Sequence, residues 1–271
     1  MSAAGTWKNE YGSIMTLQEA GANLIGIYRS STGSVGTYEV QGVQVGNAAT
    51  AEMGQPVALS ISWHAIDDAS HDPSWHWQSG LCGQISLQDD EEVLVLAHNM
   101  VASSDFCGLV KAGSYIDKLT YRRAPLHEPE RSLPRKNEVP GNGLAGRWIS
   151  AEGATLELKV FAACDNGLGY VSGRLVRSAG TVPVRGFTDL HSAPVGIAMQ
   201  SLALTAAGAS EVLGLSGALD GATGCLSLFE MTSESTAPGN SYSQTRMASV
   251  LFNREAQHLS EIGAQTAGAM I

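Results

Sequence analysis

Two short segments near the start of the chain carry hydrogen-bonding side chains at every second position. Asn9, Tyr11 and Ser13 form the first set, and Tyr28 and Ser30 form the second. Side chains two apart on a strand point to the same face, so both sets are expected on one face of a sheet. Inward-facing polar groups need partners, because an unpaired buried polar group costs about 1 to 3 kcal/mol. The pattern predicts that these groups meet a ligand, a water molecule or a neighbouring hydroxyl.

The elements that position these residues are predicted to be strands. Apolar and polar residues alternate along the chain, with glycine, asparagine or aspartate roughly every 8 to 12 residues, as in an antiparallel meander. The clearest runs before residue 122 are 14–17, 24–28, 38–43 and 57–63, and those after residue 143 are 155–160, 169–176, 182–187, 196–204, 225–231 and 246–254. An up-and-down barrel of about eight strands removes sheet edges and encloses room for one small ligand. The sequence predicts an all-β protein with two such eight-stranded antiparallel up-and-down barrels in tandem.

A proline-rich segment separates the two sets of runs. Residues 122–143 contain four prolines and eight charged residues, which is typical of an extended linker. We expect a first barrel over residues 1–123, a linker over 124–143, a second barrel over 144–255 and a C-terminal tail over 256–271.

Composition narrows the class of protein. The net charge is -10 and no cationic stripe is present, so a nucleic-acid partner is not expected. No apolar stretch approaches the roughly 18 residues that span a bilayer, so membrane insertion is not expected. The chain begins without the features of a signal peptide, which predicts a soluble protein that is either cytoplasmic or secreted after removal of a leader.

Four cysteines fall two in each half, without the C-x-x-C spacing of a zinc knuckle. They are Cys82, Cys107, Cys164 and Cys225. Cys82 and Cys107 could form a disulfide, or both could be free thiols.

Three segments carry a resemblance to the avidin and streptavidin family. G-T-W-K-N-E-Y-G-S (5–13) and G-I-Y-R-S-S-T-G (26–33) resemble the first strands of that family, and G-R-W-I-S-A-E-G (146–153) repeats the spacing of the first segment. The resemblance implies two tandem streptavidin-like barrels. It also implies that Asn9, Ser13 and Tyr28 converge on the ureido oxygen of biotin, and that Ser30 accepts from a ureido N–H.

The same resemblance extends to further residues. Trp63 is similar to the tryptophan that packs on the ligand ring, and Asp117, in D-K-L-T-Y, is similar to the aspartate that takes the second ureido N–H. The loop 31–36 is expected to close over the ligand and offer backbone N–H groups to its carboxylate. For residues 74–82 two registers stay open, because a one-residue slip moves every side chain to the other face: either Ser74, His76 and Gln78 face inward, or Trp75 and Trp77 do. The candidate ligand-binding residues are Asn9, Tyr11, Ser13, Tyr28, Ser30, Thr32, Trp63, Ser74, His76, Trp77 and Asp117.

Two departures from the family predict weaker binding. The aromatic residue of the family's seventh strand is replaced by V-L-V-L (93–96), and no tryptophan lies near 106–109, where a neighbouring subunit's tryptophan is expected. Lost aromatic contact lowers affinity. Biotin or a related cyclic ligand, bound more weakly than by typical avidins, is therefore the leading hypothesis.

Other functions rank lower. We find no nucleophile, base and acid set and no G-x-S-x-G motif, so the protein is expected to be a non-enzymatic binder without a cofactor. A cluster of acids and histidines is interpreted as solvated loop rather than as a metal site; its members are His64, Asp67, Asp68, His71, Asp72 and His76. One alternative is an interaction, effector or toxin-like protein that uses the barrels as a scaffold without binding biotin. A weaker alternative is a carbohydrate site at Trp75, His76 and Trp77.

The second half lacks the hydrogen-bonding set. Ser150 stands for Asn9, Leu175 for Tyr28, Arg177 for Ser30 and Ser249 for Asp117. We expect this half not to bind biotin and to cover the surface that a second avidin-like subunit would cover. A homodimer or pseudo-tetramer through barrel faces stays open.

Overall fold

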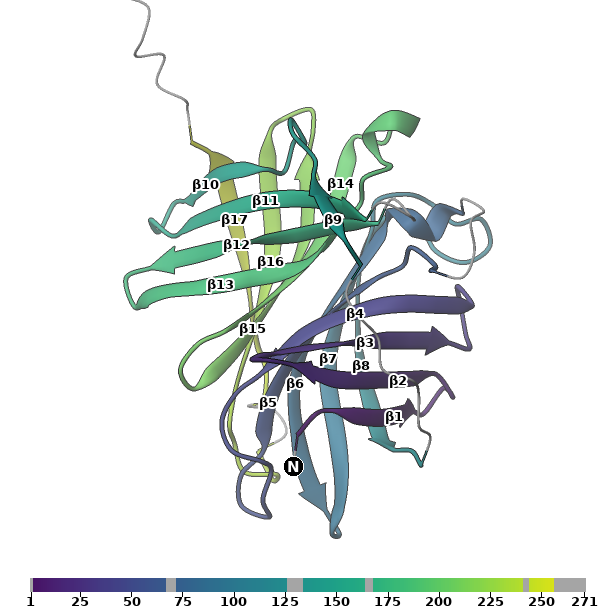
Figure 1. Cartoon of the computed structure of the whole chain (residues 1–271), viewed down its shortest axis with the longest axis vertical. Helices are drawn as coiled ribbons and strands as arrows, with labels where there is room; N and C mark the ends of the chain where they lie inside the picture. The colour runs from purple at the N-terminus through teal and green to yellow at the C-terminus, as the bar shows by residue number, and fades with distance from the viewer. Residues whose placement is uncertain (1, 67–71, 126–133, 164–167, 241–243, 256–271) are drawn as a thin grey trace, which may run out of the picture.

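The computed structural model describes residues 2–66, 72–125, 134–163, 168–240 and 244–255. These residues form two closed eight-stranded antiparallel barrels in which sequential strands are neighbours (Figure 1). The predicted fold class is therefore confirmed. The expected tail, 256–271, lies outside the described residues.

The first barrel closes where its last strand pairs with its first, placing Asn9 opposite Tyr121. Alternating side chains fill its interior with one apolar core that includes Trp7, Leu59 and Leu94. Its strands are β1 (Gly5–Asn9), β2 (Ile14–Ala20), β3 (Asn23–Ser30), β4 (Gly36–Gln44), β5 (Gln55–Ser62), β6 (Trp77–Gln88), β7 (Glu91–Ala102) and β8 (Gly113–Arg123), with a short 3₁₀ helix η1 (Pro73–His76) before β6.

The second barrel closes in the same way, with Ser150 opposite Phe252. A short strand, β9 (Lys136–Glu138), adds to the outer part of β11, so part of the segment expected to be a linker is paired to the second sheet. The boundaries of the two halves stay a prediction. The strands of the ring are β10 (Gly146–Ser150), β11 (Thr155–Ala163), β12 (Gly169–Arg177), β13 (Gly180–Thr188), β14 (Met199–Ala207), β15 (Glu211–Asp220), β16 (Cys225–Glu234) and β17 (Arg246–Arg254), with a 3₁₀ helix η2 (Ala193–Val195) before β14.

The closed ends of the two barrels repeat one arrangement. The indole N–H of Trp7 donates to the Ala3 carbonyl at 2.8 Å, and that of Trp148 donates to the Leu144 carbonyl at 2.9 Å. An arginine from the last strand lies over each ring, Arg123 in the first barrel and Arg254 in the second. The shared arrangement is what the repeated G-x-W motif predicts.

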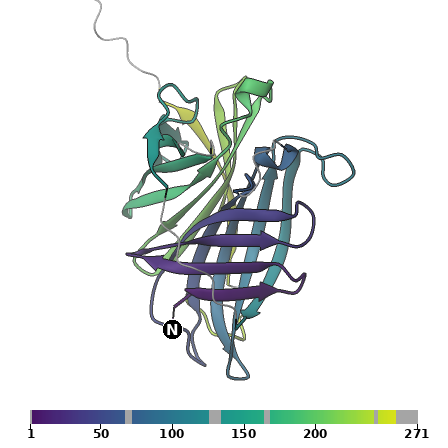
Figure 2. The same cartoon turned by 45° about the vertical axis from the view of Figure 1, so that its right-hand side comes forward.

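The barrels pack side against side, with β4–β7 of the first facing β13–β16 of the second (Figures 1 and 2). An apolar cluster fills part of the junction and consists of Val43, Ala58, Cys82, Val212 and Met231. A Cβ at Gly80 would lie 2.8 Å from the Ser216 hydroxyl, so a glycine is needed for this close approach. The outer face of each sheet at the junction is thus covered by the other barrel.

Cys82 is buried in this junction and Cys107 is exposed, and both are free thiols. The disulfide alternative is therefore wrong for this structure, because the Cys82 side chain points to the neighbouring barrel rather than to Cys107. Cys164 lies outside the described residues.

In the described part of the chain no helix has the length and apolar character needed to cross a bilayer.

Candidate functional site

The open end of the first barrel contains a cavity of about 380 Å³. The cavity is lined by polar groups and by large apolar side chains, as is common in small-molecule sites. Its lining comprises Asn9, Tyr11, Tyr28, Ser30, Thr32, Ile61, Trp63, Leu81, His98, Met100, Asp117, Leu119 and Tyr121. Seven of the candidate residues are thus brought together, from three strands (β1, β3 and β8) and from the connections that follow β1, β3 and β5.

The first polar wall is a turn rather than a continuous strand. β1 ends at Asn9, so Tyr11 and Ser13 lie in the connection to β2, where Gly12 has a φ of +90°. The expectation that three residues alternate along one strand is therefore wrong. The turn still gathers them, because the Asn9 Oδ1 accepts the backbone N–H groups of Tyr11 at 3.1 Å and Ser13 at 2.8 Å. The Oδ1 is occupied in this way, and the Nδ2 is the group that Asn9 can offer to a ligand.

Ser13 is buried and hydrogen-bonded within the protein. Its Oγ accepts the Ser31 backbone N–H at 3.1 Å. The Ser31 hydroxyl donates its proton to the Tyr11 carbonyl at 3.0 Å. In the 3.2 Å contact between the Ser13 and Ser31 hydroxyls, Ser13 is therefore the donor. Ser13 must therefore rotate its hydroxyl before it can donate to a ligand.

Two tyrosine hydroxyls meet at the bottom of the cavity. Burial raises the pKa of Tyr28, although the neighbouring Ser13, Tyr121 and Asn9 act to lower it. Burial also raises the pKa of Tyr121 well above its usual range, and the neighbouring Tyr28 adds to that rise. Both phenols therefore stay protonated at neutral pH and can act as donors. The Tyr121 hydroxyl is buried beside Tyr28 and Asn9 and makes no hydrogen bond of ordinary geometry with another described residue.

Acceptors lie at the mouth of the cavity. The Ser30 hydroxyl donates to the Thr32 carbonyl at 2.6 Å, so its proton is occupied and its lone pairs are free to accept an N–H. Asp117, on the exposed edge of β8, accepts the backbone N–H of Lys118 through Oδ1 at 2.7 Å. The cavity thus has donors at its base and acceptors nearer to solvent.

A chain of three side chains crosses the cavity wall. The Trp63 indole N–H donates to the Ser79 Oγ at 2.8 Å, and the same oxygen lies 2.8 Å from the Nε2 of His98. Burial lowers the pKa of His98 to about 4, against an opposing effect of Asp117. His98 is therefore neutral at pH 7, and its Nε2 can accept the Ser79 hydroxyl proton. The sequence reasoning missed Ser79, His98 and Tyr121, although Tyr121 shares a strand face with Asp117 and Leu119.

The register of β6 decides where the segment 74–82 points. Trp77 packs against Trp63 with ring centroids 6.4 Å apart, and Ser79 and Leu81 follow it on the inner face. Gln78 and His76 do not line the cavity. The structure therefore selects the register with Trp77 inward.

Ser74 and His76 occupy other places. The Ser74 hydroxyl lies 3.1 Å from the Trp63 carbonyl and 3.1 Å from the Ser34 hydroxyl, behind the cavity wall. The His76 Nδ1 lies 2.8 Å from the Asp189 carboxylate of the second barrel, with both side chains buried. The structure brings neither residue into the cavity lining.

The expected acidic and histidine cluster is only partly described. No group of three potential metal ligands occurs among the residues that the structure describes. Asp67, Asp68 and His71 lie outside those residues.

The seventh strand contributes different residues from those expected. Leu94 and Leu96 are fully buried in the barrel core, and His98 and Met100 are the residues of β7 that line the cavity. Neither is a phenylalanine, tyrosine or tryptophan, so β7 supplies no large aromatic side chain to this wall of the cavity.

Comparison of the two barrels corrects one correspondence. Tyr121 lies opposite Asn9 in the first barrel, and Phe252 lies opposite Ser150 in the second, so Tyr121 and Phe252 correspond. Four residues earlier on each strand, Asp117 therefore corresponds to Ala248 and not to Ser249. The error was a slip of one residue, which moves a side chain to the opposite face.

Comparison with known proteins identifies the first barrel. The avidin family model matches residues 1–110. Solved structures with a similar fold include xenavidin (18% identity, TM-score 0.35, 45% of this chain and 96% of that one), a rhizavidin–biotin complex (19%, 0.36, 47% and 100%) and a biotin-binding protein from chicken (17%, 0.35, 45% and 96%). No curated protein matches the chain.

Proposed function

We propose that the first barrel, whose residues 1–110 match the avidin family model, is a non-enzymatic binder of biotin or of a related cyclic urea. The observation that carries the proposal is the cavity of about 380 Å³, in which hydrogen-bond donors, acceptors and one tryptophan are brought together. A cyclic urea presents one carbonyl oxygen between two N–H groups, so it needs donors on one side and acceptors on the other two.

The polar groups are suitably divided for such a ligand. Asn9 Nδ2 and the Tyr28 hydroxyl can donate to the urea oxygen, and Ser13 can join them after rotating its hydroxyl. Ser30 and Asp117 can accept the two N–H groups. Trp63 supplies an aromatic surface for the ring system, and its orientation is fixed by its hydrogen bond to Ser79.

The affinity is expected to be lower than in avidins with more aromatic walls. One aromatic side chain buries about 150 to 250 Å², and at about 25 cal/mol per Å² its loss removes several kcal/mol of binding free energy. His98 and Met100 line the wall contributed by β7, and Asp117 is exposed to water that competes for its hydrogen bonds. These features favour weak biotin binding or a preference for a related ligand.

A thermal-shift titration with biotin tests the proposal. A ligand that binds only the folded state must raise the melting temperature, and the rise grows with ligand concentration. Tyr28→Phe removes one donor and should weaken binding by about tenfold, as expected for one buried hydrogen bond of about 1.4 kcal/mol. Tyr115→Phe is the matched control, because Tyr115 lies on β8 outside the cavity and its hydroxyl bonds only Lys111 among the described residues.

The second candidate is an interaction or effector protein that uses the barrels only as a scaffold. It is favoured by the missing aromatic wall, which leaves a cavity of the inherited shape with fewer ligand contacts. No melting shift at millimolar biotin, in wild type and in both variants, would reject biotin binding and support this candidate. The packing of β4–β7 on β13–β16 already forms a dimer-like contact within one chain, so we propose that any further oligomer uses other barrel faces.

A further inference from the structure

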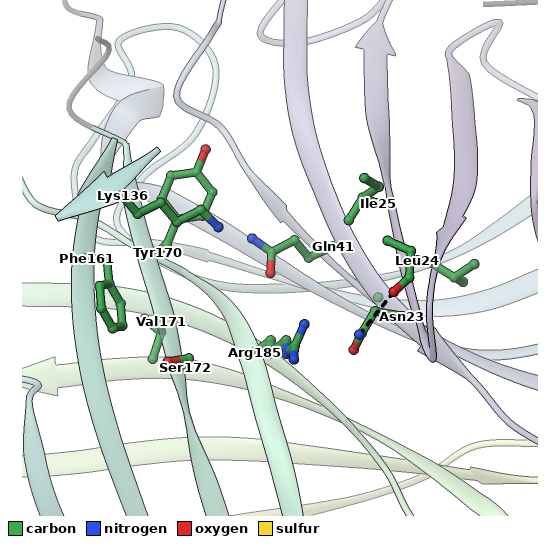
Figure 3. Close-up of a pocket in the computed structure, with 12 residues that line it drawn as sticks. Asn23, Leu24, Ile25, Gln41, Lys136, Phe161, Tyr170, Val171, Ser172 and Arg185 are labelled. Atoms are coloured by element: carbon green, nitrogen blue, oxygen red, sulfur yellow. Dashed lines mark hydrogen bonds between the residues drawn. The ribbon is translucent and has the colours of Figure 1, made fainter. Parts of the chain in front are cut away.

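A second cavity, of about 330 Å³, lies at the junction of the two barrels and shares no lining residue with the barrel cavity. We call it the junction cleft. The end of β2 with β3 and β4 of the first barrel forms one wall, and β9, β11, β12 and β13 of the second form the other (Figure 3).

The charges around the junction cleft are opposite in sign to those of the whole protein. The chain has 26 acidic and 16 basic residues, yet the lining contains Lys136 and Arg185 and no acid. One carboxylate acts on the cleft from outside its lining: Glu39 accepts the Tyr170 hydroxyl at 2.7 Å and its charge opposes the lowering of the Lys136 pKa, so two cations stand against one acid. The cleft is therefore a local positive site in a protein of net charge -10.

Lys136 is held in place over an aromatic ring. Its Nζ lies 3.6 Å from the centroid of Tyr170, which fixes the ammonium at the wall of the cleft. Burial, with a smaller contribution from Arg185 and against an opposing effect of Glu39, lowers the pKa of Lys136 to about 8. An anion bound between Lys136 and Arg185 would offset both the loss of solvation and the repulsion between the two cations.

An unpaired amide donor lies in the wall of the cleft. Gln41 is only 7% exposed, and its Nε2 has no hydrogen-bond partner among the described residues. Figure 3 shows the Gln41 side chain projecting from the first barrel toward the second, where Tyr170, Lys136 and Arg185 lie on the opposite wall of the cleft. A buried donor without a partner is costly, and a ligand acceptor would satisfy it.

Apolar side chains cover part of the remaining wall. They come from Ile25 of the first barrel and Phe161 of the second, while Asn23 and Ser172 add two small polar groups and Leu24 and Val171 belong to the cores of their own barrels. Inorganic phosphate would leave this surface without contact. A ligand with one anionic end and an apolar body would use both parts of the cleft.

We propose that the junction cleft binds a small organic carboxylate with an apolar or aromatic body, its carboxylate between Lys136 and Arg185 and within reach of the Gln41 amide. Both barrels contribute to this site, so it exists only because the two are joined face to face. The site does not depend on whether the first barrel binds biotin.

Saturation-transfer NMR on the full chain with benzoate tests the proposal, with neutral benzamide as the matched probe. Benzoate should bind the wild-type protein at millimolar concentration and benzamide at least tenfold more weakly. Lys136→Gln together with Arg185→Gln should abolish the benzoate signal, and the melting temperature of this variant checks that it stays folded. Lys159→Gln, which removes an exposed lysine of β11 outside the cleft, should bind benzoate like the wild type.

Gln41→Leu separates a binding role from a structural one. It removes the unpaired amide and keeps a similar shape, so the free protein should be as stable as wild type or more so, and benzoate affinity should fall severalfold. Saturating biotin should leave the benzoate signal unchanged, because the two cavities share no residue.

Three results would overturn the proposal. They are no benzoate signal from the wild type, equal signals from wild type and the Lys136/Arg185 double variant, and full displacement of benzoate by an equimolar amount of inorganic phosphate.

Discussion

The two barrels have the same framework and opposite interiors. Each has a tryptophan near the closed end covered by an arginine, and each has the same turn after the first strand: the N–H of Gly12 donates to the Asn9 carbonyl at 3.0 Å, and that of Gly153 to the Ser150 carbonyl at 3.0 Å. The tryptophan and the arginine lie at the closed end of each barrel, whereas the turn lies at the mouth, where Asn9 and Tyr11 line the cavity of the first barrel. The two barrels therefore share this framework although their side chains at the mouth differ.

The mouths differ in the residues at corresponding positions. Tyr28 of the first barrel corresponds to Leu175, which is buried in the core of the second. Ser30 corresponds to Arg177. His98 corresponds to Glu230, because His98 lies opposite Asp117 and Glu230 lies opposite Ala248, the residue that matches Asp117. Arg177 and Glu230 form an ion pair. The second barrel thus has an ion pair where the first has an uncharged hydroxyl and an imidazole.

This difference shows that barrel closure and ligand binding depend on separate residues. The framework can be duplicated while one copy loses the cavity chemistry and serves as a packing partner. Changes that exchange or remove the corresponding residues can test this separation.

The largest effect is expected from breaking the contact between the barrels. The Asp189 carboxylate accepts the backbone N–H of His191 at 2.6 Å and lies 2.8 Å from the ring of buried His76, so Asp189→Ala removes both contacts. We expect a loss of about 3 kcal/mol in the free energy of unfolding, measured by urea denaturation. Glu152→Ala, in an exposed turn of the same barrel, makes the same charge change and should cost little. Equal losses in the two variants would contradict a buried interface at this position.

A pH effect is expected from His98. Its pKa in the folded state, about 4, is below the unfolded value of 6.5, so its contribution is fully present above pH 6.5 and is lost as pH falls toward 4. The free energy of unfolding should fall by about 2 kcal/mol between pH 7 and pH 5 from this group.

His98→Gln should remove that part of the pH dependence, measured as the difference between the two denaturation curves at each pH. Identical pH profiles for wild type and variant would show that the imidazole is not held neutral by burial.

The smallest effect is expected from the ion pair in the second barrel. Arg177→Ser leaves Glu230, whose side chain is 12% exposed, without its cation and should cost about 1 kcal/mol of stability. The double variant Arg177→Ser with Glu230→His restores the residue types of the first barrel and should recover most of that loss. Thermal denaturation measures both, and a double variant less stable than the single one would show that the framework does not accept the exchange.

The sequence predicted the fold well because its signals are local. Alternation, turn residues and the repeated G-x-W motif set the strands and their order, and the family assignment of residues 1–110 is confirmed. Tyr28 and Ser30, which lie within the G-I-Y-R-S motif that carries the resemblance, line the cavity, and their role in ligand binding stays a prediction.

What the sequence missed depends on long-range register. His98 and Ser79 meet only after β6 and β7 pair, and the choice between Trp77 and His76 rests on a one-residue shift that no local pattern fixes. The junction cleft could not be predicted either, because Gln41 and Lys136 meet only once the two barrels have packed together. Whether the gathered residues bind biotin stays a prediction.

The most direct test of the account is the stoichiometry of biotin binding to the full chain, measured by calorimetry or native mass spectrometry. The account predicts one biotin per chain, and no binding to a chain that carries Tyr28→Leu, which gives the first barrel the residue that the second already has. Two biotins per chain would contradict the proposed difference between the barrels, and unchanged binding to the Tyr28→Leu chain would place the ligand outside the proposed cavity.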